Sequence, residues 1–120
     1  MNVRMEQTVQ HTGLIERYLA TVRALPELAP GAARNLAWRS WSGDRAARQA
    51  LIERHLWMVV EQAVRLSPLD RVMQSRLIAS GNLVLVAAAE RYRPWDDAEF
   101  APFARAALLA DTEKEVLPES

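Results

Sequence analysis

Apolar side chains recur at intervals of three and four residues along most of the chain, and prolines and glycines divide it into segments of helical length. That spacing places the apolar side chains on one face of an α-helix. The pattern predicts helices at about residues 7–24, 33–41, 45–66, 68–92 and 102–116. No segment alternates in the way that a half-buried strand does.

Short polar side chains mark two of the predicted helix starts. Asp44 follows a Ser-Gly stop and is expected to cap the next helix, because its carboxylate accepts hydrogen bonds from free backbone N–H groups. Ser67 and Asp70 have the spacing of a capping box, and Pro68 suits the first helical position. Gly81 lies inside the predicted helix at 68–92, at a cost of about 1 kcal/mol relative to alanine.

These elements predict an all-α fold, a compact bundle of about five helices. Half of the 120 residues are apolar and a quarter are charged, which is typical of a globular domain. We interpret residues 1–32 as an N-terminal helix and linker, and residues 33–117 as the helical domain. Because the chain has no cysteine, disulfides, thiolate metal sites and a cysteine nucleophile are excluded.

The apolar runs favour a cytoplasmic protein without membrane contact. Residues 1–10 are polar and charged and lack the apolar core of a signal peptide. No run approaches the roughly 18 apolar residues that span a bilayer. The formal net charge is zero, yet residues 1–95 contain 13 Lys or Arg against 8 Asp or Glu, and residues 96–120 contain two against seven. The last segment is therefore acidic.

Two stretches resemble region two of the bacterial RNA polymerase sigma factors. Residues 43–60 contain a Gly-Asp pair, an Ala-Arg step and a Leu-Ile-Glu…Leu…Val-Val pattern like those that open its first core helix. Residues 77–94, LIASGNLVLVAAAERYRP, are similar to the family's Leu-Ile-Gln-Glu-Gly-Asn-Ile-Gly-Leu-Ile-Arg-Ala-Val-Glu-Lys-Phe-Asp-Pro. Phe100 and Phe103-Ala104 then fall where the family has Phe and Tyr-Ala. The likeness covers about residues 33–110.

The resemblance implies a sigma region two-like fold and a transcription protein that contacts RNA polymerase core, promoter DNA or both. In the family, the Gly-Asn helix docks on the polymerase through a polar and acidic face. The residues that the resemblance assigns to partner binding here are Arg76, Ala79, Ser80, Asn82, Val84 and Ala87. The first three replace the family's polar and acidic residues, and the last two make the face more apolar.

The last predicted helix departs from the family in the same direction. Ala106, Ala107 and Leu109 stand where the family places aromatic and basic residues that open the promoter, and acidic residues follow them. This departure favours a second hypothesis, a degenerate sigma-like interaction module without DNA binding. Such a module would regulate by binding another protein or by forming a homodimer. Both hypotheses stay open from the sequence.

Arginines and tryptophans provide candidate nucleic-acid contacts, because cations neutralise phosphates and aromatic planes stack on bases. The candidates are Arg39, Arg45, Arg48, Trp95 and Arg105. Interleaved acidic residues favour the alternative that the arginines lie on a solvated, ion-paired helix face. Trp38, Trp41 and Trp57 have the spacing of residues that fill or rim a core, whereas Trp95 lies in a predicted turn and is expected to be exposed.

Nothing in the pattern indicates catalysis or a cofactor. His11 and His55 have no acidic residue at metal-ligand spacing, and Asp96-Asp97 are interpreted as a helix cap in a loop. No phosphate-binding glycine loop or nucleophile motif occurs. We expect a protein that is not an enzyme. The run from Leu83 to Ala89 is apolar at seven consecutive positions, so some of its side chains must leave the core or meet another chain.

Overall fold

The computed structural model describes residues 16–29 and 31–116, and every regular element in that part of the chain is an α-helix. Residues 16–24 are helical, and the remaining helices are α2 (Ala32–Trp41), α3 (Arg45–Glu53), α4 (Leu56–Leu66), α5 (Arg71–Arg91) and α6 (Phe100–Val116). The predicted all-α fold of about five helices is confirmed. The predicted helix at 7–24 begins outside the described residues.

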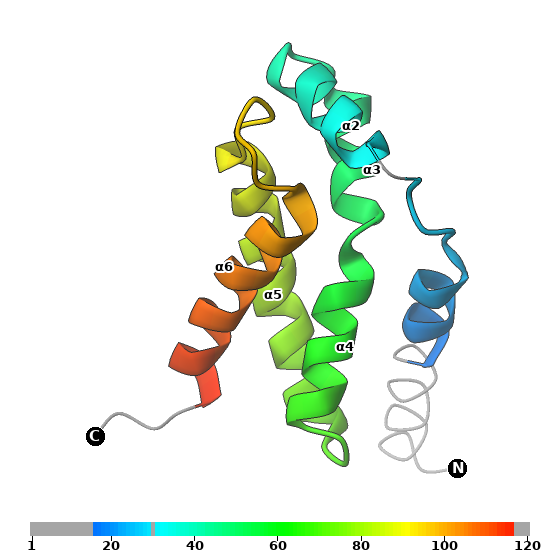
Figure 1. Ribbon diagram of the computed structural model, residues 1–120. Coiled ribbons are helices and arrows are strands. Elements are labelled where there is room, and N and C mark those ends of the chain that lie inside the picture. The colour runs from blue at the N-terminus through cyan, green and yellow to red at the C-terminus, as the bar shows by residue number, and fades with distance from the viewer. Residues whose placement is uncertain (1–15, 30, 117–120) are drawn as a thin grey trace.

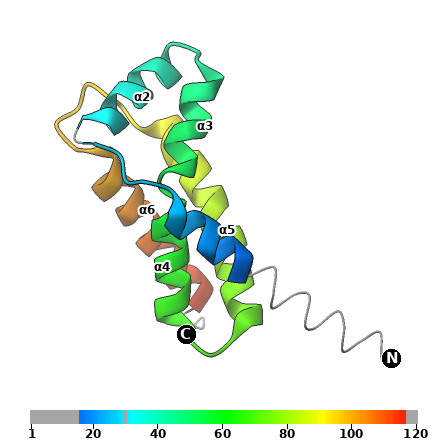
Figure 2. The ribbon, with the colours of Figure 1, turned by 90° about the vertical axis from the view of Figure 1, so that its right-hand side faces the viewer.

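Helix α5 is the centre of the bundle (Figure 1). It packs most extensively against α4 and α6 and also contacts α3, while α2 packs against α3 at one end of the molecule. Residues 16–24 lie across α4 and α5 (Figure 2). Leu19 and Val22 from this segment are buried in the same core as the later helices.

The core consists of apolar side chains contributed by every described helix. The largest of its fully buried side chains are Leu51, Met58, Leu85, Phe100 and Leu108. Burying side chains of this size removes the most apolar surface from water and is the main stabilising contribution to such a bundle. Two polar residues, His55 and Gln74, are buried among them.

The helix predicted at 45–66 is divided in two by Arg54 and His55. The Nδ1 atom of His55 donates a hydrogen bond of 2.7 Å to the carbonyl oxygen of Leu51, which an uninterrupted helix would use for the backbone N–H of His55. That N–H donates to Ile52 instead. Arg54 donates to the carbonyl oxygen of Pro26 and links the break to the segment before α2. The prediction of one helix was wrong here.

The start of α5 also differs from the prediction. The carboxylate of Asp70 accepts a 3.0 Å hydrogen bond from the backbone N–H of Met73 and caps the helix. Ser67 belongs to the preceding turn, where its carbonyl oxygen accepts a 2.6 Å bond from Nε2 of buried Gln74. The helix therefore begins three residues later than the Ser67-Pro68 start that the sequence predicted. Its interior continues through Gly81.

Helix α5 is long and apolar enough to cross a membrane by length and composition alone. Core helices of globular domains meet the same criterion, because they too are apolar on several sides. Here α4 and α6 pack against it, and 39% of its apolar window is buried. The described residues contain no second helix of this kind.

Candidate functional site

The outer side of α5 carries a stripe of exposed residues, which we call the α5 stripe. Its members recur at intervals of four and three residues: Val72, Arg76, Ala79, Leu83, Val86 and Glu90. Leu83 is 73% exposed and Val72 is 65% exposed, whereas Val86 is half-buried. Exposed apolar side chains gathered on one face are typical of a protein-binding surface.

The residues predicted to bind a partner divide between this stripe and the interior. Arg76 and Ala79 are exposed, and Ala87 is half-buried beside the stripe. Ser80 points toward α6, where its hydroxyl donates a 2.9 Å hydrogen bond to Asp111. Asn82 points toward the N-terminal helix and donates a 3.3 Å bond to the hydroxyl oxygen of Tyr18.

Val84 is half-buried at the edge of the core. Ser80 and Asn82 each donate a hydrogen bond within the chain and Val84 packs against the core, so we leave these three residues out of the α5 stripe. The buried Oδ1 atom of Asn82 has no hydrogen-bond partner among the described residues. The apolar run from Leu83 to Ala89 divides in the same way, since Leu85, Ala88 and Ala89 are buried and Leu83 is exposed.

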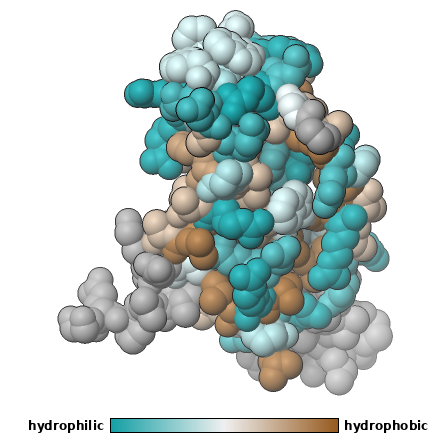
Figure 3. All heavy atoms as spheres, in the orientation of Figure 1, coloured by the Kyte–Doolittle hydropathy of each residue, from teal (hydrophilic) through white to brown (hydrophobic). Residues whose placement is uncertain are grey.

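Further apolar surface continues from the stripe into the α4–α5 turn. Leu66 is exposed at the end of α4, and Leu69 is almost fully exposed. Figure 3 shows brown, apolar atoms at this end of the molecule, whereas hydrophilic side chains cover much of α2 and α3. Exposed aliphatic side chains thus gather at the α4–α5 turn and along α5.

The arginines predicted to contact nucleic acid are largely paired with other side chains. Arg39 donates to Oδ2 of Asp44 through Nε at 3.1 Å and Nη2 at 2.8 Å. The pKa of Asp44 is lowered below its ordinary value, mainly by the hydrogen bond from the backbone N–H of Ala47 and secondly by the hydrogen bonds from Arg39. Arg48 pairs with Glu90.

The other two predicted arginines have different surroundings. The guanidinium of Arg105 lies 5.6 Å from the ring centre of Trp57. Arg45 is exposed, and it has no ion pair within the described part of the chain. The arrangement resembles the solvated, ion-paired face more than a phosphate-binding stripe.

Three tryptophans form an exposed aromatic cluster at the end of the molecule opposite the α4–α5 turn. The ring centres of Trp41 and Trp95 are 5.2 Å apart, and Trp38 lies 6.2 Å from Trp41 and 5.9 Å from Trp95. All three are between 42% and 63% exposed. Trp95 was expected to be exposed, as observed. Trp38 and Trp41 were expected to fill or rim the core, but they lie on the surface and pack against each other and against Trp95. Trp57 is half-buried against the core.

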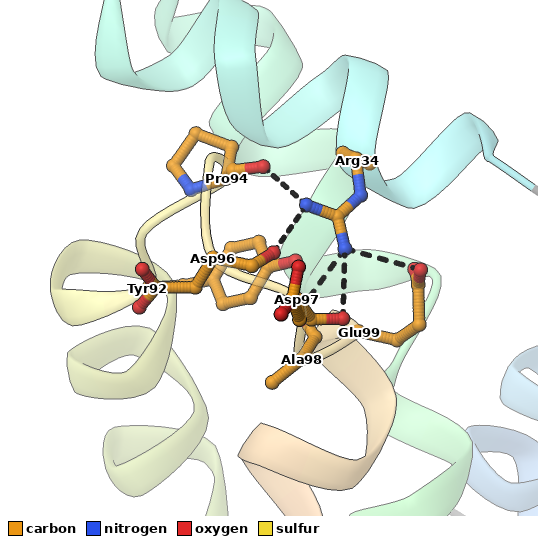
Figure 4. Close-up of polar contacts among 7 residues, drawn as sticks. All are labelled: Arg34, Tyr92, Pro94, Asp96, Asp97, Ala98 and Glu99. Carbon is orange, nitrogen blue, oxygen red and sulfur yellow. Dashed lines mark hydrogen bonds and ion pairs between the residues drawn. The ribbon is translucent and has the colours of Figure 1, made fainter.

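Arg34 holds the loop that carries Trp95 (Figure 4). Its Nη1 donates to the carbonyl oxygens of Pro94 and, at 2.6 Å, Asp96. Its Nη2 donates to Asp97 and Ala98 at 3.4 and 3.3 Å. The same Nη2 also donates to the carboxylate of Glu99 at 3.1 Å, and this bond raises the pKa of Arg34 above its ordinary value.

The loop therefore uses Asp96 and Asp97 through their main chains. Neither carboxylate accepts a hydrogen bond from a described residue, so the expected helix cap is not observed. The hydroxyl of Tyr92 donates a 2.7 Å bond to the carbonyl oxygen of Ala98, and burial raises the pKa of that tyrosine. Helix α6 then begins at Phe100, two residues before the predicted start.

The surroundings of His55 are those of a core residue. Its ring packs edge-to-face against Phe100, with 4.7 Å between ring centres, and burial lowers the pKa of the imidazole below 6.5. Within residues 16–29 and 31–116, no group of three His, Asp or Glu side chains is arranged to hold a metal ion. His11 lies outside the described residues.

Sequence reasoning named only part of these surfaces. The interval of four and three residues from Val72 to Leu83 is visible in the sequence and provided a signal for the α5 stripe. No comparable signal existed for the tryptophan cluster, because Trp38 and Trp95 are far apart along the chain. The contacts of Arg34 across more than 60 residues were equally hidden.

Fold and surface together define an all-helical bundle protein with an exposed apolar face on its central helix. Neither a protein-family model nor a curated protein matches this chain.

Proposed function

We propose that this chain is a transcription protein of sigma region two-like type that acts by binding another protein through the α5 stripe. The partner is RNA polymerase core or a regulatory protein, and the role is not catalytic. The observation that carries the proposal is the exposure of Val72, Ala79 and Leu83 on the helix that resembles the family's polymerase-docking helix. A leucine that is 73% exposed beside other apolar residues favours a covering partner.

The composition of the stripe supports a protein as its partner. Apolar side chains gain free energy by leaving water when a partner covers them. A nucleic acid would instead require unpaired cations, and Arg76 is the one cation among the six residues of the stripe. On the acidic segment of α6, the carboxylate of Asp111 accepts a hydrogen bond from the hydroxyl of Ser80. The proposal therefore assigns no promoter contact to α5 or α6.

Site-specific photo-crosslinking in host cells tests this proposal. A photoreactive amino acid at Leu83 is expected to capture a polymerase core subunit or one regulatory protein reproducibly. The matched control is Leu109, a half-exposed leucine on α6, where the same amino acid is expected to capture no such protein. The proposal would be contradicted if position 83 captured no protein other than this chain, or if positions 83 and 109 captured the same proteins.

A second variant separates loss of binding from loss of folding. Leu83→Asp introduces a charge at a position that is largely exposed, so circular dichroism is expected to show unchanged helix content. Recovery of the crosslinked partner by tagged L83D protein is expected to fall by about tenfold or more, since a charge at the centre of an apolar contact must be desolvated. Equal recovery of the partner by the L83D protein and by the unaltered protein would contradict binding through the α5 stripe.

Binding of single-stranded promoter DNA is a second candidate function, favoured by the exposed cluster of Trp38, Trp41 and Trp95. Exposed indole rings stack on bases without sequence preference. Titration with a single-stranded oligonucleotide is expected to quench tryptophan emission, and Trp41→Ala is expected to reduce affinity by about fivefold or more. Trp57→Phe is the control, because Trp57 lies outside the cluster. Unchanged emission at low salt would exclude this function.

A further inference from the structure

The α5 stripe has the spacing of a helix that pairs with another helix. Intervals of four and three residues repeat without interruption from Val72 to Glu90, so these residues share one side of the helix. At about 1.5 Å per residue, the stripe is about 27 Å long. The buried residues of α5, including Leu85 and Ala88, belong to a different side that faces α4 and α6. The helix therefore has one side for the core and a second side that no described helix covers.

Part of the stripe, together with half-buried Ala87 beside it, is arranged symmetrically about Leu83. Ala79 precedes Leu83 by four residues, and Ala87 follows it by four. Arg76 precedes Leu83 by seven residues, and Glu90 follows it by seven. Leu83 thus has an alanine on each side, with a positive charge at one end of the arrangement and a negative charge at the other. In an antiparallel pair of these helices centred on Leu83, each small residue would face a small residue and each charge would face the opposite charge.

We propose that two copies of the chain pair through α5 as an antiparallel, two-fold symmetric homodimer. In that arrangement Leu83 meets its counterpart, each Ala79 faces the other copy's Ala87, and each Arg76 faces the other copy's Glu90. A parallel pair would instead bring Arg76 against Arg76 and Glu90 against Glu90, which like-charge repulsion disfavours. The charges on the stripe therefore select a second copy in the antiparallel direction.

The charged ends of the stripe are available for this contact. Arg76 is exposed and has no ion pair within the described part of the chain. Glu90 already pairs with Arg48, but its side chain remains 54% exposed. A carboxylate has about four lone-pair directions, so Glu90 can accept from an arginine of a second copy while keeping Arg48.

The small alanines allow the two helices to approach closely, and an isologous contact of this kind closes after two copies. Because one helix face of about 27 Å buries less surface than the roughly 800 Å² per partner of a standard interface, we expect a reversible dimer. On the proposed function, on which this consequence rests, the dimer would cover the face that binds the other protein. Self-association and partner binding would then compete.

Charge reversal on purified full-length protein tests the dimer directly. Sedimentation equilibrium is expected to show reversible dimerisation of the unaltered chain, weakened by about tenfold or more in Arg76→Glu and in Glu90→Arg. Mixing these two variants is expected to restore association, because each mixed dimer contains one native and one reversed Arg–Glu pair. Circular dichroism checks that both variants stay helical. Arg45→Glu, an exposed change on α3, is the control and is expected to dimerise normally.

A cysteine variant supplies an independent readout that needs no change of charge. The chain has no cysteine, so Leu83→Cys introduces a single thiol at the two-fold centre. Mild oxidation is expected to link L83C into a disulfide dimer about tenfold faster than Leu109→Cys on α6. This test keeps the proposal falsifiable even if a charge-reversal variant fails to fold.

The results separate the dimer from the proposed function. A monomer at every concentration, or equal disulfide formation at both cysteine positions, would overturn the dimer, and capture of a different protein at Leu83 in cells would leave the proposed function standing. A dimer that the mixture restores supports the inference, even if no other protein is captured at Leu83. Association that Arg76→Glu does not weaken would overturn the antiparallel pairing.

Discussion

Gly81 on α5 faces Val59 on α4 so closely that a Cβ atom added at Gly81 would lie 2.7 Å from Cγ1 of Val59. Valine in a helix is held near one rotamer and cannot easily turn away. We therefore expect Gly81→Ala to lower the free energy of unfolding by about 1–3 kcal/mol, although alanine is the better helix former by about 1 kcal/mol. Urea denaturation followed by circular dichroism measures the change.

The control for this prediction removes the other half of the contact. If steric conflict is the cause, combining Gly81→Ala with Val59→Ala is expected to cost less than the sum of the two single changes. Additive effects, or a stabilising Gly81→Ala, would show that α4 moves aside freely.

The cap of α5 supplies a second prediction. Asp70→Ala removes the carboxylate that accepts from Met73 and is expected to lower stability by about 1 kcal/mol. Ser67→Ala is the matched control, because the structure uses only the carbonyl oxygen of Ser67 and leaves the change close to neutral. Thermal or urea denaturation compares the two. The reverse order would mean that the helix starts at Ser67, as the sequence alone suggested.

The loop held by Arg34 supplies a third prediction. Arg34→Met keeps an unbranched, flexible side chain and removes every side-chain hydrogen bond from position 34 to residues 94–99. We expect faster hydrogen exchange in that loop, greater quenching of tryptophan emission by acrylamide, and a lower midpoint of thermal unfolding. Arg45→Met is the control, and unchanged exchange in the loop of R34M would show that the arginine is dispensable.

The stability of the protein should depend on pH through His55. Burial lowers the pKa of His55 in the folded state below 6.5, so the unfolded chain binds more protons in the interval between the two values. The contribution of the neutral ring is fully present above about 6.5 and is lost as pH falls through the lower, folded-state pKa. We expect the free energy of unfolding to decrease on acidification from pH 7 toward pH 5.5.

Replacing His55 by asparagine tests the cause of that pH dependence. The amide of His55→Asn can still donate to Leu51 but does not titrate, so its stability is expected to change less over the same interval. Both proteins are compared with His11→Asn, which removes the other histidine of the chain. Equal slopes with and without His55 would contradict the prediction.

Local sequence signals predicted helix ends where a nearby side chain decides them. Asp44 caps α3 as expected, with its carboxylate 3.0 Å from the N–H of Ala47. The break at His55 was not predicted because it depends on which group donates a hydrogen bond to the Leu51 carbonyl oxygen. It also depends on the hydrogen bond from Arg54 to the carbonyl oxygen of Pro26. A periodic pattern of apolar residues contains no information about such competition.

The candidate surfaces show the same limit. The exposure of Arg76 and Ala79 followed from their position beside an apolar run, but the directions of Ser80 and Asn82 depend on Asp111 and Tyr18 in other helices. Those partners lie 31 and 64 residues away along the chain. Periodicity describes one helix at a time, so it cannot tell which neighbour each polar side chain will meet.

Because Arg34 binds residues 96–98 through main-chain oxygens, the path of these three exposed residues depends little on which side chains they carry. Asp96 and Asp97 are exposed, and Arg34 holds their main-chain oxygens (Figure 4). This loop is therefore a suitable place for sequence diversification. Libraries varied at positions 96 and 97 would change what the molecule displays beside Trp95 while the helices that support it stay the same.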